Sequence, residues 1–338
     1  MVVILRSLVS KVVKMSNVLL FFITFSMILL STIIIFSIER ETFPTLFDAL
    51  WWVMTTVTTV GYGDFYPVTI AGRIFAMFLY IFGIGILGVV IGKIVDSFAT
   101  IKRLKEEGKL KYTGAGHIVI FGWSKKAEIA IHEIINSDEK IEIVIIDQLA
   151  REPFPHDRVI YIQGDPSVEN TMMMANLQNA KAAIVFADDT IDNSVLVDGK
   201  SLLFVSAVEH YAPDVYTVVE ILREDHIKNF KHVNVDEFVL SHEMISRLLV
   251  QSTIQNGITD VISQLLSRSI GDDIYEIEKK ENWITYKDAV VALMNDGATL
   301  IGAGNKLNVN EVLNEKIPND VCLRIICSKE TLEKIISR

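Results

Sequence analysis

One short segment of this sequence, TTVGYGD at positions 58–64, has residue types and spacing that could do chemistry. A potassium ion that sheds its water needs oxygen ligands in exchange, and backbone carbonyl groups facing one axis can supply them. Such a row of carbonyls needs backbone conformations that most L-residues avoid, and Gly61 and Gly63 permit them. The Thr59 hydroxyl would add one more oxygen at the inner end. The segment is therefore predicted to coordinate dehydrated K⁺ through Thr59, Val60, Gly61, Tyr62 and Gly63.

One loop of this kind cannot close a ring around an ion. Four copies are required, so the motif predicts a homotetramer. Val60 and Tyr62 would then point away from the ion and pack against a supporting helix. The alternative interpretation is an ordinary Gly-Tyr-Gly turn outside a membrane. The context favours the pore loop, because the motif follows a predicted short helix and is flanked by two predicted membrane spans.

Two long apolar segments flank the motif. Residues 18–38 are 21 residues without a charge, and a helix of that length crosses a bilayer core of about 30 Å. A signal peptide is the alternative, but its apolar region would be shorter and followed by small residues at a cleavage site. Here Glu39 and Arg40 follow instead. Residues 74–95 are uncharged as far as Lys93, which is close enough to the end to reach the membrane interface. Both segments are predicted membrane spans.

Basic residues flank the pair of spans rather than the loop between them. They are Arg6, Lys11 and Lys14 before the first span and Lys102, Arg103 and Lys105 after the second. Because positive charge gathers on the cytoplasmic side of membrane proteins, we expect both termini in the cytoplasm of a multi-pass protein of the cell membrane. Neither span is rich in arginine, so no voltage sensor is expected and opening would be driven chemically.

The loop at 39–73 is unusual for an exposed connection. It contains a semi-apolar stretch, TLFDALWWVMTT at 45–56, which is long enough for a short helix. Trp51 and Trp52 suit a membrane interface. Non-helical backbone at membrane depth is tolerated only where it is buried in protein or lines a water-filled path. A short helix followed by a glycine-rich segment therefore predicts a re-entrant pore loop.

The spans, the pore loop and the TVGYG motif resemble those of prokaryotic two-transmembrane potassium channels that carry a cytosolic RCK domain (regulator of potassium conductance). The resemblance implies a potassium-selective, ligand-gated channel and not an enzyme. It also implies a second span that lines the pore and bends near a glycine. The segment FGIG at 82–85 matches that region, so Gly83 is the expected hinge. Close packing of small residues between helices is the alternative role for this glycine.

The rest of the chain alternates strand-like and helix-like segments. The strand-like ones are short and largely apolar, and they lie at 117–121, 141–146, 159–162, 182–186, 215–220 and 237–240. This alternation predicts a parallel, doubly wound sheet. The expected fold is an all-α membrane pore domain, with two transmembrane helices, a pore helix and a filter, followed by an α/β Rossmann-like domain and a small α+β lobe.

The expected boundaries follow from these patterns. They are a pore domain at 1–97, a charged linker at 98–113, a Rossmann-like RCK N-lobe at 114–241, a helical crossover at 242–267 and an RCK C-lobe at 268–338. In the family that the chain resembles, the crossover helices exchange between subunits and eight RCK domains form a gating ring. This sequence holds one such domain, so the source of the other four is open.

Doubly wound sheets bind ligands at the carboxyl ends of their strands, near the point where the strand order reverses. There a helix N-terminus could receive a phosphate, lysines could neutralise it, and an acidic residue could hold ribose hydroxyls. The predicted nucleotide-binding residues are Gly122, Trp123, Ser124, Lys125, Asp147, Gly164 and Asp165, with Lys126 as a second lysine. The fingerprint G-x-G-x-x-G is incomplete, because only Gly122 is in place. The family includes members that bind NAD or adenine nucleotides such as ADP and members that bind none. An empty fold, with Asp147 and Asp165 as turn and cap residues, is therefore the alternative.

Calcium is the other common ligand that the resemblance implies, and the family's carboxylate pattern is only partly met. Glu220 ends the fifth strand-like segment, where one ligand is expected, and Asp188 lies in an acidic stretch after the fourth. Leu222 and Phe186 stand where the family has further carboxylates. Glu220 and Asp188 are the candidate metal ligands, and a solvated acidic loop is the alternative. The seven histidines lack metal-ligand spacing.

Charge and cysteine content exclude several classes of protein. Residues 1–106 carry nine Lys/Arg and six Asp/Glu, whereas 107–338 carry 23 and 36. So acidic a part does not suit a nucleic-acid partner. Cys322 and Cys327 make no disulfide framework and fit small core residues of a reduced domain.

A membrane-tethered dehydrogenase would need a catalytic acid or base that the sequence lacks. A subunit of a potassium uptake transporter would normally carry several imperfect pore loops in one chain.

Overall fold

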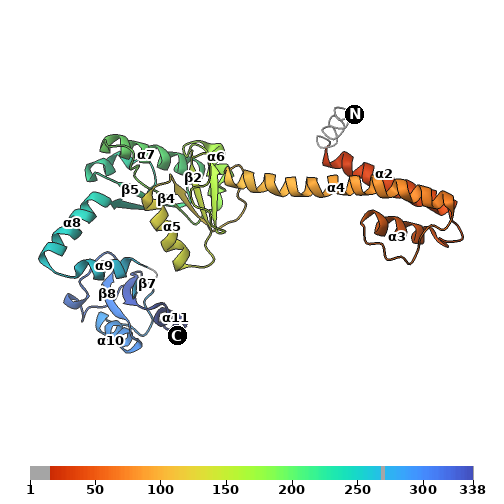
Figure 1. Cartoon of the computed structure of the whole chain (residues 1–338). Helices are drawn as coiled ribbons and strands as arrows, with labels where there is room; N and C mark the ends of the chain where they lie inside the picture. Colours follow the sequence, from red (N-terminus) through yellow and green to blue (C-terminus); the bar gives the residue numbers. More distant parts are fainter. Residues whose placement is uncertain (1–15, 268–270, 338) are drawn as a thin grey trace. The chain divides into compact units, whose positions relative to one another are not determined.

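A computed structural model describes residues 16–267 and 271–337, in a helical unit that ends at Leu104 and a mixed unit that begins at Lys105. The helical unit contains α2 (Asn17–Ile38), α3 (Leu46–Val57) and α4 (Ile70–Glu106) (Figure 1). Ser16 caps α2 by accepting a hydrogen bond from the Leu19 amide, and Thr45 and Asp48 form a capping box on α3. These caps satisfy amides that have no partner within the helix.

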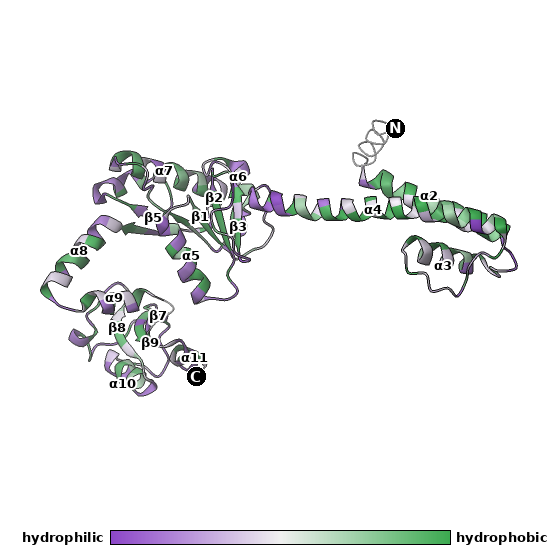
Figure 2. Cartoon of the chain, in the orientation of Figure 1, coloured by the Kyte–Doolittle hydropathy of each residue, from purple (hydrophilic) through white to green (hydrophobic). Residues whose placement is uncertain are grey.

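The apolar residues of α2 and α4 are too many to be buried within one helical unit. Figure 2 shows hydrophobic colouring along most of both helices and hydrophilic colouring at the C-terminal end of α4. Among the described residues, these two helices are long and apolar enough to cross a membrane. The small core of the unit lies where α3 packs against them, and its buried residues are Ile35, Phe43, Ala49, Trp52, Val53, Val57, Ala76 and Leu79.

The predicted linker at 98–113 divides in the structure. Its first part continues α4 without a break as far as Glu106. Its second part is bound to the mixed unit by backbone hydrogen bonds. The Gln163 amide donates to the Gly108 carbonyl at 2.9 Å, and the Tyr112 amide donates to the Met174 carbonyl at 2.8 Å. The segment after the helix is therefore docked along the sheet rather than loose.

The mixed unit is built on a six-stranded parallel sheet. Its strands are β1 (Ile118–Phe121), β2 (Ile143–Asp147), β3 (Val159–Gln163), β4 (Ala182–Val185), β5 (Tyr216–Ile221) and β6 (Glu237–Leu240). They lie in the order β3-β2-β1-β4-β5-β6, and every neighbouring pair is parallel. The predicted doubly wound sheet is confirmed, and its strand order reverses between β1 and β4.

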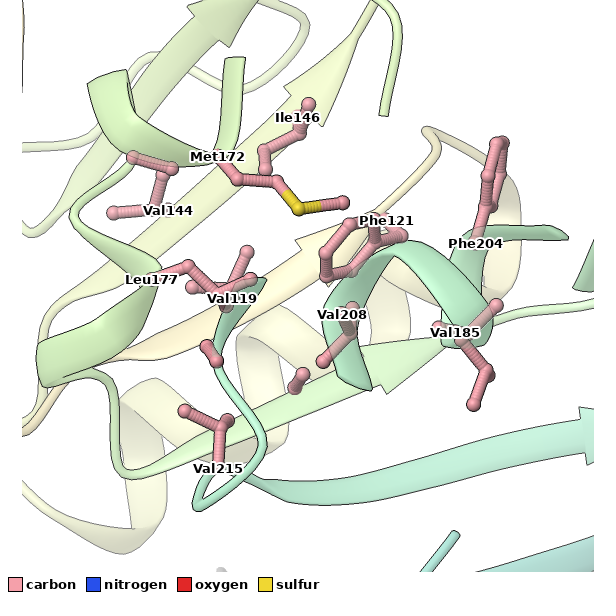
Figure 3. Close-up of a cluster of buried hydrophobic side chains, with 14 of the residues drawn as sticks. Val119, Phe121, Val144, Ile146, Met172, Leu177, Val185, Phe204, Val208 and Val215 are labelled. Carbon is pink, nitrogen blue, oxygen red and sulfur yellow. The ribbon is translucent and has the colours of Figure 1, made fainter. Parts of the chain in front are cut away.

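Helices cover both faces of this sheet. Each strand contributes side chains to both faces, because successive side chains of a strand point to opposite faces. Helix α5 (Lys125–Ser137) packs with Ile120 and its neighbours on one face. Helices α6 (Glu169–Met174) and α7 (Ser194–Tyr211) pack with Val119 and Phe121 on the other. Figure 3 shows this second cluster, in which Met172 and Phe204 lie close to Phe121. Two short 3-10 helices, η1 (Leu177–Asn179) and η2 (Glu224–Phe230), complete the layer.

Two amphipathic helices, α8 (Ser241–Ile254) and α9 (Ile258–Leu266), follow the sheet and are joined at Gly257, whose φ is +84°. A three-stranded antiparallel sheet then forms, in the order β7-β9-β8, from β7 (Asp273–Ile277), β8 (Thr299–Ala303) and β9 (Leu323–Cys327). Helices α10 (Tyr286–Asp296) and α11 (Lys329–Ser337) and the 3-10 turn η3 (Val309–Glu311) belong to the same lobe. Cys327 lies in its core as expected, whereas Cys322 is partly exposed.

Candidate functional site

The TVGYG segment follows the C-terminal end of α3. The Thr55 carbonyl accepts hydrogen bonds from both the Val60 and the Gly61 amides, at 2.8 and 3.1 Å. The backbone then alternates, because φ is positive at Thr59 (+61°), Gly61 (+57°) and Gly63 (+77°). Glycine adopts such values without a steric cost, which was the expected reason for the two glycines. Thr59 shares this conformation although it is β-branched.

Two side-chain contacts attach the far end of the segment to α3. The Tyr62 ring stacks on the Trp51 ring with centroids 5.7 Å apart and planes 2° from parallel. The Trp51 indole N–H donates to the Asp64 carboxylate at 2.8 Å. Thr55 of α3 thus holds the start of the segment through Val60 and Gly61, and Trp51 of α3 holds its end through Tyr62 and Asp64. This arrangement fixes a strip of backbone beside the short helix α3.

A buried carboxylate connects the C-terminal end of α2 with the N-terminal end of α4. Glu39 is 3% exposed, and it accepts hydrogen bonds from the Thr69 amide and hydroxyl at 2.7 and 2.6 Å. It also accepts from the Val68 amide and the Thr42 hydroxyl. The sequence interpretation had treated Glu39 only as the charge that ends a span. Its role as an anchor could not be found locally, because Val68 and Thr69, which join it to α4, lie about 30 positions away.

Gly83 lies inside the continuous helix α4 and faces the end of α3. A Cβ placed on Gly83 would come within 3.1 Å of Val57 Cγ2, whereas one placed on Gly85 would meet nothing within 4 Å. Gly83 is therefore a point of close helix packing in this structure. Close packing is the alternative to the hinge that was predicted at this glycine.

A cavity of about 670 Å³ opens at the carboxyl ends of β1, β2 and β4, where the strand order reverses. Most of the predicted nucleotide residues line it, and these are Gly122, Trp123, Ser124, Lys125, Asp147 and Asp165. Gly164 does not, because it packs against Thr171. The cavity also has apolar walls that were not predicted, formed by Leu149, Phe186, Leu203 and Phe204.

Asp147 organises the first turn of this cavity. Its carboxylate accepts hydrogen bonds from the backbone amides of Trp123 at 2.6 Å, Gln148 at 2.6 Å and Leu149 at 3.2 Å. Ser124 caps α5 by accepting from the Ala127 amide. The left-handed φ of Gly122, +84°, turns the chain from β1 into the helix. Asp147 thus holds the loop in shape and lies beside the cavity at the same time.

The cavity is also lined by a lysine that was not one of those expected. Lys125 is mostly exposed and pairs with Glu128 of its own helix. Lys200, from α7, lines the cavity and pairs with Asp188 at 2.5 Å. Burial disfavours the Asp188 carboxylate, but Lys200 and Thr190 outweigh this effect and lower its pKa to about 2. No local signal marks Lys200, because only the packing of α7 brings it to the cavity.

The two predicted metal ligands are held by different lysines. Asp188 pairs with Lys200, and Glu220 pairs with Lys126 at 2.8 Å. Burial opposes the charge on Lys126, but its carboxylate partners, Asp189 and Glu220, raise its pKa above the ordinary value. The described residues contain no group of three or more His, Cys, Asp or Glu side chains that could hold a metal ion.

Similarity to known proteins follows the same division into two units. Residues 18–100 match the family described as "Ion channel", and residues 118–241 match the "TrkA-N domain". Over 235 residues the chain is 32% identical to the calcium-gated potassium channel TvoK of Thermoplasma volcanium. The aligned region covers 69% of this chain and 67% of TvoK. The chain belongs to the potassium channels that carry a TrkA-N (RCK) domain.

Two further comparisons agree with this family. The channel is 26% identical over 288 residues to the putative potassium channel protein YugO of Bacillus subtilis, covering 83% of this chain and 86% of YugO. Its fold is similar to the solved GsuK channel, with a TM-score of 0.50 at 14% identity, covering 94% of this chain and 58% of that one. A membrane protein is therefore indicated, with α2 and α4 as its apolar helices, and these relatives are channels rather than enzymes.

Proposed function

We propose that this channel is a potassium-selective pore of four identical chains in the cell membrane, with both termini in the cytoplasm. The observation that carries the proposal is the alternating backbone of the TVGYG segment, with positive φ at Thr59, Gly61 and Gly63. A strip of backbone with alternating φ that is anchored to a short helix can present successive carbonyl oxygens to an ion. One chain provides one strip, so fourfold symmetry is needed to surround the ion.

Planar-bilayer recording of the purified channel tests this proposal directly. We expect the reversal potential to follow the K⁺ gradient, with Na⁺ permeability lower by about a hundredfold or more, because the carbonyl ligands must replace the hydration shell of a particular ion. A matched variant, Gly63→Ala, should lose this selectivity, because its φ of +77° strains any residue with a Cβ. Comparable Na⁺ and K⁺ conductance in the unaltered channel would refute the proposal.

We further propose that ligand binding at the cavity in the N-lobe controls opening. The cavity combines the N-terminus of α5, apolar walls and Lys200. A helix N-terminus with a nearby ammonium suits phosphate, and apolar walls suit a flat base. An adenine nucleotide such as NAD or ADP is the ligand class with both parts. The predicted residues in this role are Gly122, Trp123, Ser124, Lys125, Asp147, Gly164 and Asp165.

Isothermal calorimetry with NAD and ADP tests the nucleotide proposal. Asp147→Ala should weaken binding more than tenfold, because it removes the carboxylate beside the cavity together with three hydrogen bonds that shape the loop. Asp138→Ala, at the exposed C-terminus of α5, is the matched control and should bind as the unaltered channel does. Absence of nucleotide binding to the unaltered channel, or equal affinity in Asp147→Ala, would contradict this assignment.

A divalent cation is the second candidate ligand, because TvoK is a calcium-gated potassium channel. Glu220 and Asp188 are its predicted ligands. Single-channel recording while the cytosolic face is perfused in turn with Ca²⁺, Mg²⁺, NAD, ADP and ATP separates the two classes. We expect the nucleotides to change the open probability. A response to Ca²⁺ alone would favour the divalent cation over the cavity ligand.

Assembly of the cytosolic units into a gating ring is part of the same proposal. Helices α8 and α9 expose apolar side chains, among them Met244, Leu249, Val250, Ile254 and Val261. A second RCK domain would bury this surface, as the crossover helices of the family do. The proposed domain limits remain those of the sequence interpretation, and an octameric ring would need four further domains.

A further inference from the structure

The Lys126 ammonium lies in a cage of oxygen atoms at the carboxyl ends of β4 and β5. Its Nζ is 3.0 and 2.8 Å from the two carboxylate oxygens of Glu220. It is also 3.0 Å from the Ala187 carbonyl and 2.8 Å from the Asp189 carboxylate. Four oxygens from three residues therefore surround one positive charge.

This donor set is the kind that hard divalent cations take in proteins. Ca²⁺ binds carboxylates, which can be bidentate, together with backbone carbonyls. The Glu220 carboxylate has both oxygens on the ammonium, and its side chain is 8% exposed. It also accepts a hydrogen bond from the Ala187 amide at 2.9 Å. Lysine thus stands where a metal ion would find its ligands.

The position of Lys126 in its helix supports a role outside the helix. It lies in the first turn of α5, where the helix dipole disfavours a positive charge. Its side chain instead crosses to residues 61 and 94 positions later in the chain. A buried carboxylate without a partner is strongly destabilising. The ammonium therefore compensates Glu220 at a site where helix stability alone would select another residue.

We propose that Lys126 is a built-in cation that fills a divalent-cation site, so that Ca²⁺ and Mg²⁺ do not bind through Glu220. Asp188, the residue before Asp189, is also paired with a lysine, Lys200. A divalent ion could bind these four oxygens only by displacing the Lys126 ammonium from them. Until then the two positive charges would lie a few ångströms apart and repel each other. This inference refines the ligand part of the proposed function and favours the neighbouring cavity as the place where ligands act.

Removal of the lysine should uncover the site. We expect full-length Lys126→Ala channel, titrated with CaCl₂ by calorimetry in detergent and KCl, to bind about one additional Ca²⁺ per chain. Its dissociation constant should be at least tenfold lower than any seen for the unaltered channel. Lys125→Ala removes the same charge from the next residue, which pairs with Glu128 and not with Glu220, and should gain no site. The double variant Lys126→Ala/Glu220→Gln should lose the acquired site.

Two results would overturn the inference. One is a folded Lys126→Ala channel, as judged by its circular dichroism and tetramer mass, that binds Ca²⁺ no better than Lys125→Ala. The other needs no altered lysine: Ca²⁺ binding to the unaltered channel that Glu220→Gln abolishes would place the metal at the carboxylate that we assign to Lys126. Both results come from binding alone, so neither depends on whether the pore selects potassium or the cavity takes a nucleotide.

Discussion

Among single residues, Gly83 has two possible roles, as a hinge of α4 or as a point of close packing, and adding a Cβ atom there tests both. Glycine in a helix interior costs about 1 kcal/mol relative to alanine, so its presence needs a reason. The structure offers one, because α4 approaches Val57 closely enough that a Cβ would lie 3.1 Å from its Cγ2. A hinge offers another. The two reasons differ in whether the neighbour matters.

Gly83→Ala is expected to lower the open probability in single-channel recordings without changing K⁺ selectivity, because the TVGYG segment is not touched. Gly85→Ala is the matched control, since a Cβ there meets nothing within 4 Å. If packing is the cause, Val57→Ala combined with Gly83→Ala should restore opening. If backbone bending at Gly83 is the cause, the double variant should stay impaired. Unchanged opening in Gly83→Ala would refute both roles.

At the scale of an element, the segment after α4 is docked through a buried histidine. His117 is 1% exposed, and its ring lies 4.4 Å from the Tyr112 ring. Its Nε2 is 3.0 Å from the Ala175 carbonyl, while its Nδ1 has no partner among the described residues. Tyr112 in turn donates to Glu142 at 2.6 Å. Burial of the imidazole lowers the pKa of His117 below 6.5.

This depressed pKa predicts a loss of stability in acid. The unfolded chain takes up a proton at His117 near pH 6.5, whereas the folded chain resists it. The stabilisation is therefore complete above pH 6.5 and is lost as the pH falls through the folded pKa. The melting temperature can be followed by near-ultraviolet circular dichroism at pH 7.5 and at pH 5. We expect it to decrease less between these two pH values for His117→Phe than for the unaltered channel. His232→Phe, at an exposed position, is the control. Equal pH dependence in His117→Phe would contradict the assignment.

At the scale of the whole molecule, the exposed apolar face of α8 predicts association between the mixed units of different chains. Leu249 is 64% exposed and Ile254 is 70% exposed, although burial of such a side chain is worth about 1.5–3 kcal/mol. Leu249→Glu should therefore weaken this association at least tenfold, seen as less lysine cross-linking between subunits and a weaker response to ligand. Gln251→Glu adds the same charge to the same helix at a polar position and should behave normally. Undiminished cross-linking in Leu249→Glu would exclude this face as the contact.

Much of the fold and part of the site follow from the sequence alone. The first apolar helix, the short helix α3 and the six parallel strands were predicted within a few residues, because each rests on local composition and periodicity. The second apolar segment was predicted at 74–95, whereas α4 runs from Ile70 to Glu106 because the helix continues into the charged residues that follow. The positive φ values at Gly61 and Gly63 were predictable for the same reason, whereas coordination of K⁺ by the TVGYG segment stays a prediction. The cavity at the strand ends was predicted because parallel strands bring their carboxyl ends to one edge.

Only the tertiary structure decided which charges meet. Lys126 was expected to face a phosphate, yet it reaches Glu220 across 94 positions. Lys200, which no pattern marked, lies in the cavity. Glu39 binds Thr69 across 30 positions. In each case the partner is set by how helices cross a sheet or by how two spans pack, and a long side chain has several acidic neighbours within reach. Local sequence specifies the element that carries a charge, whereas packing in three dimensions selects the partner.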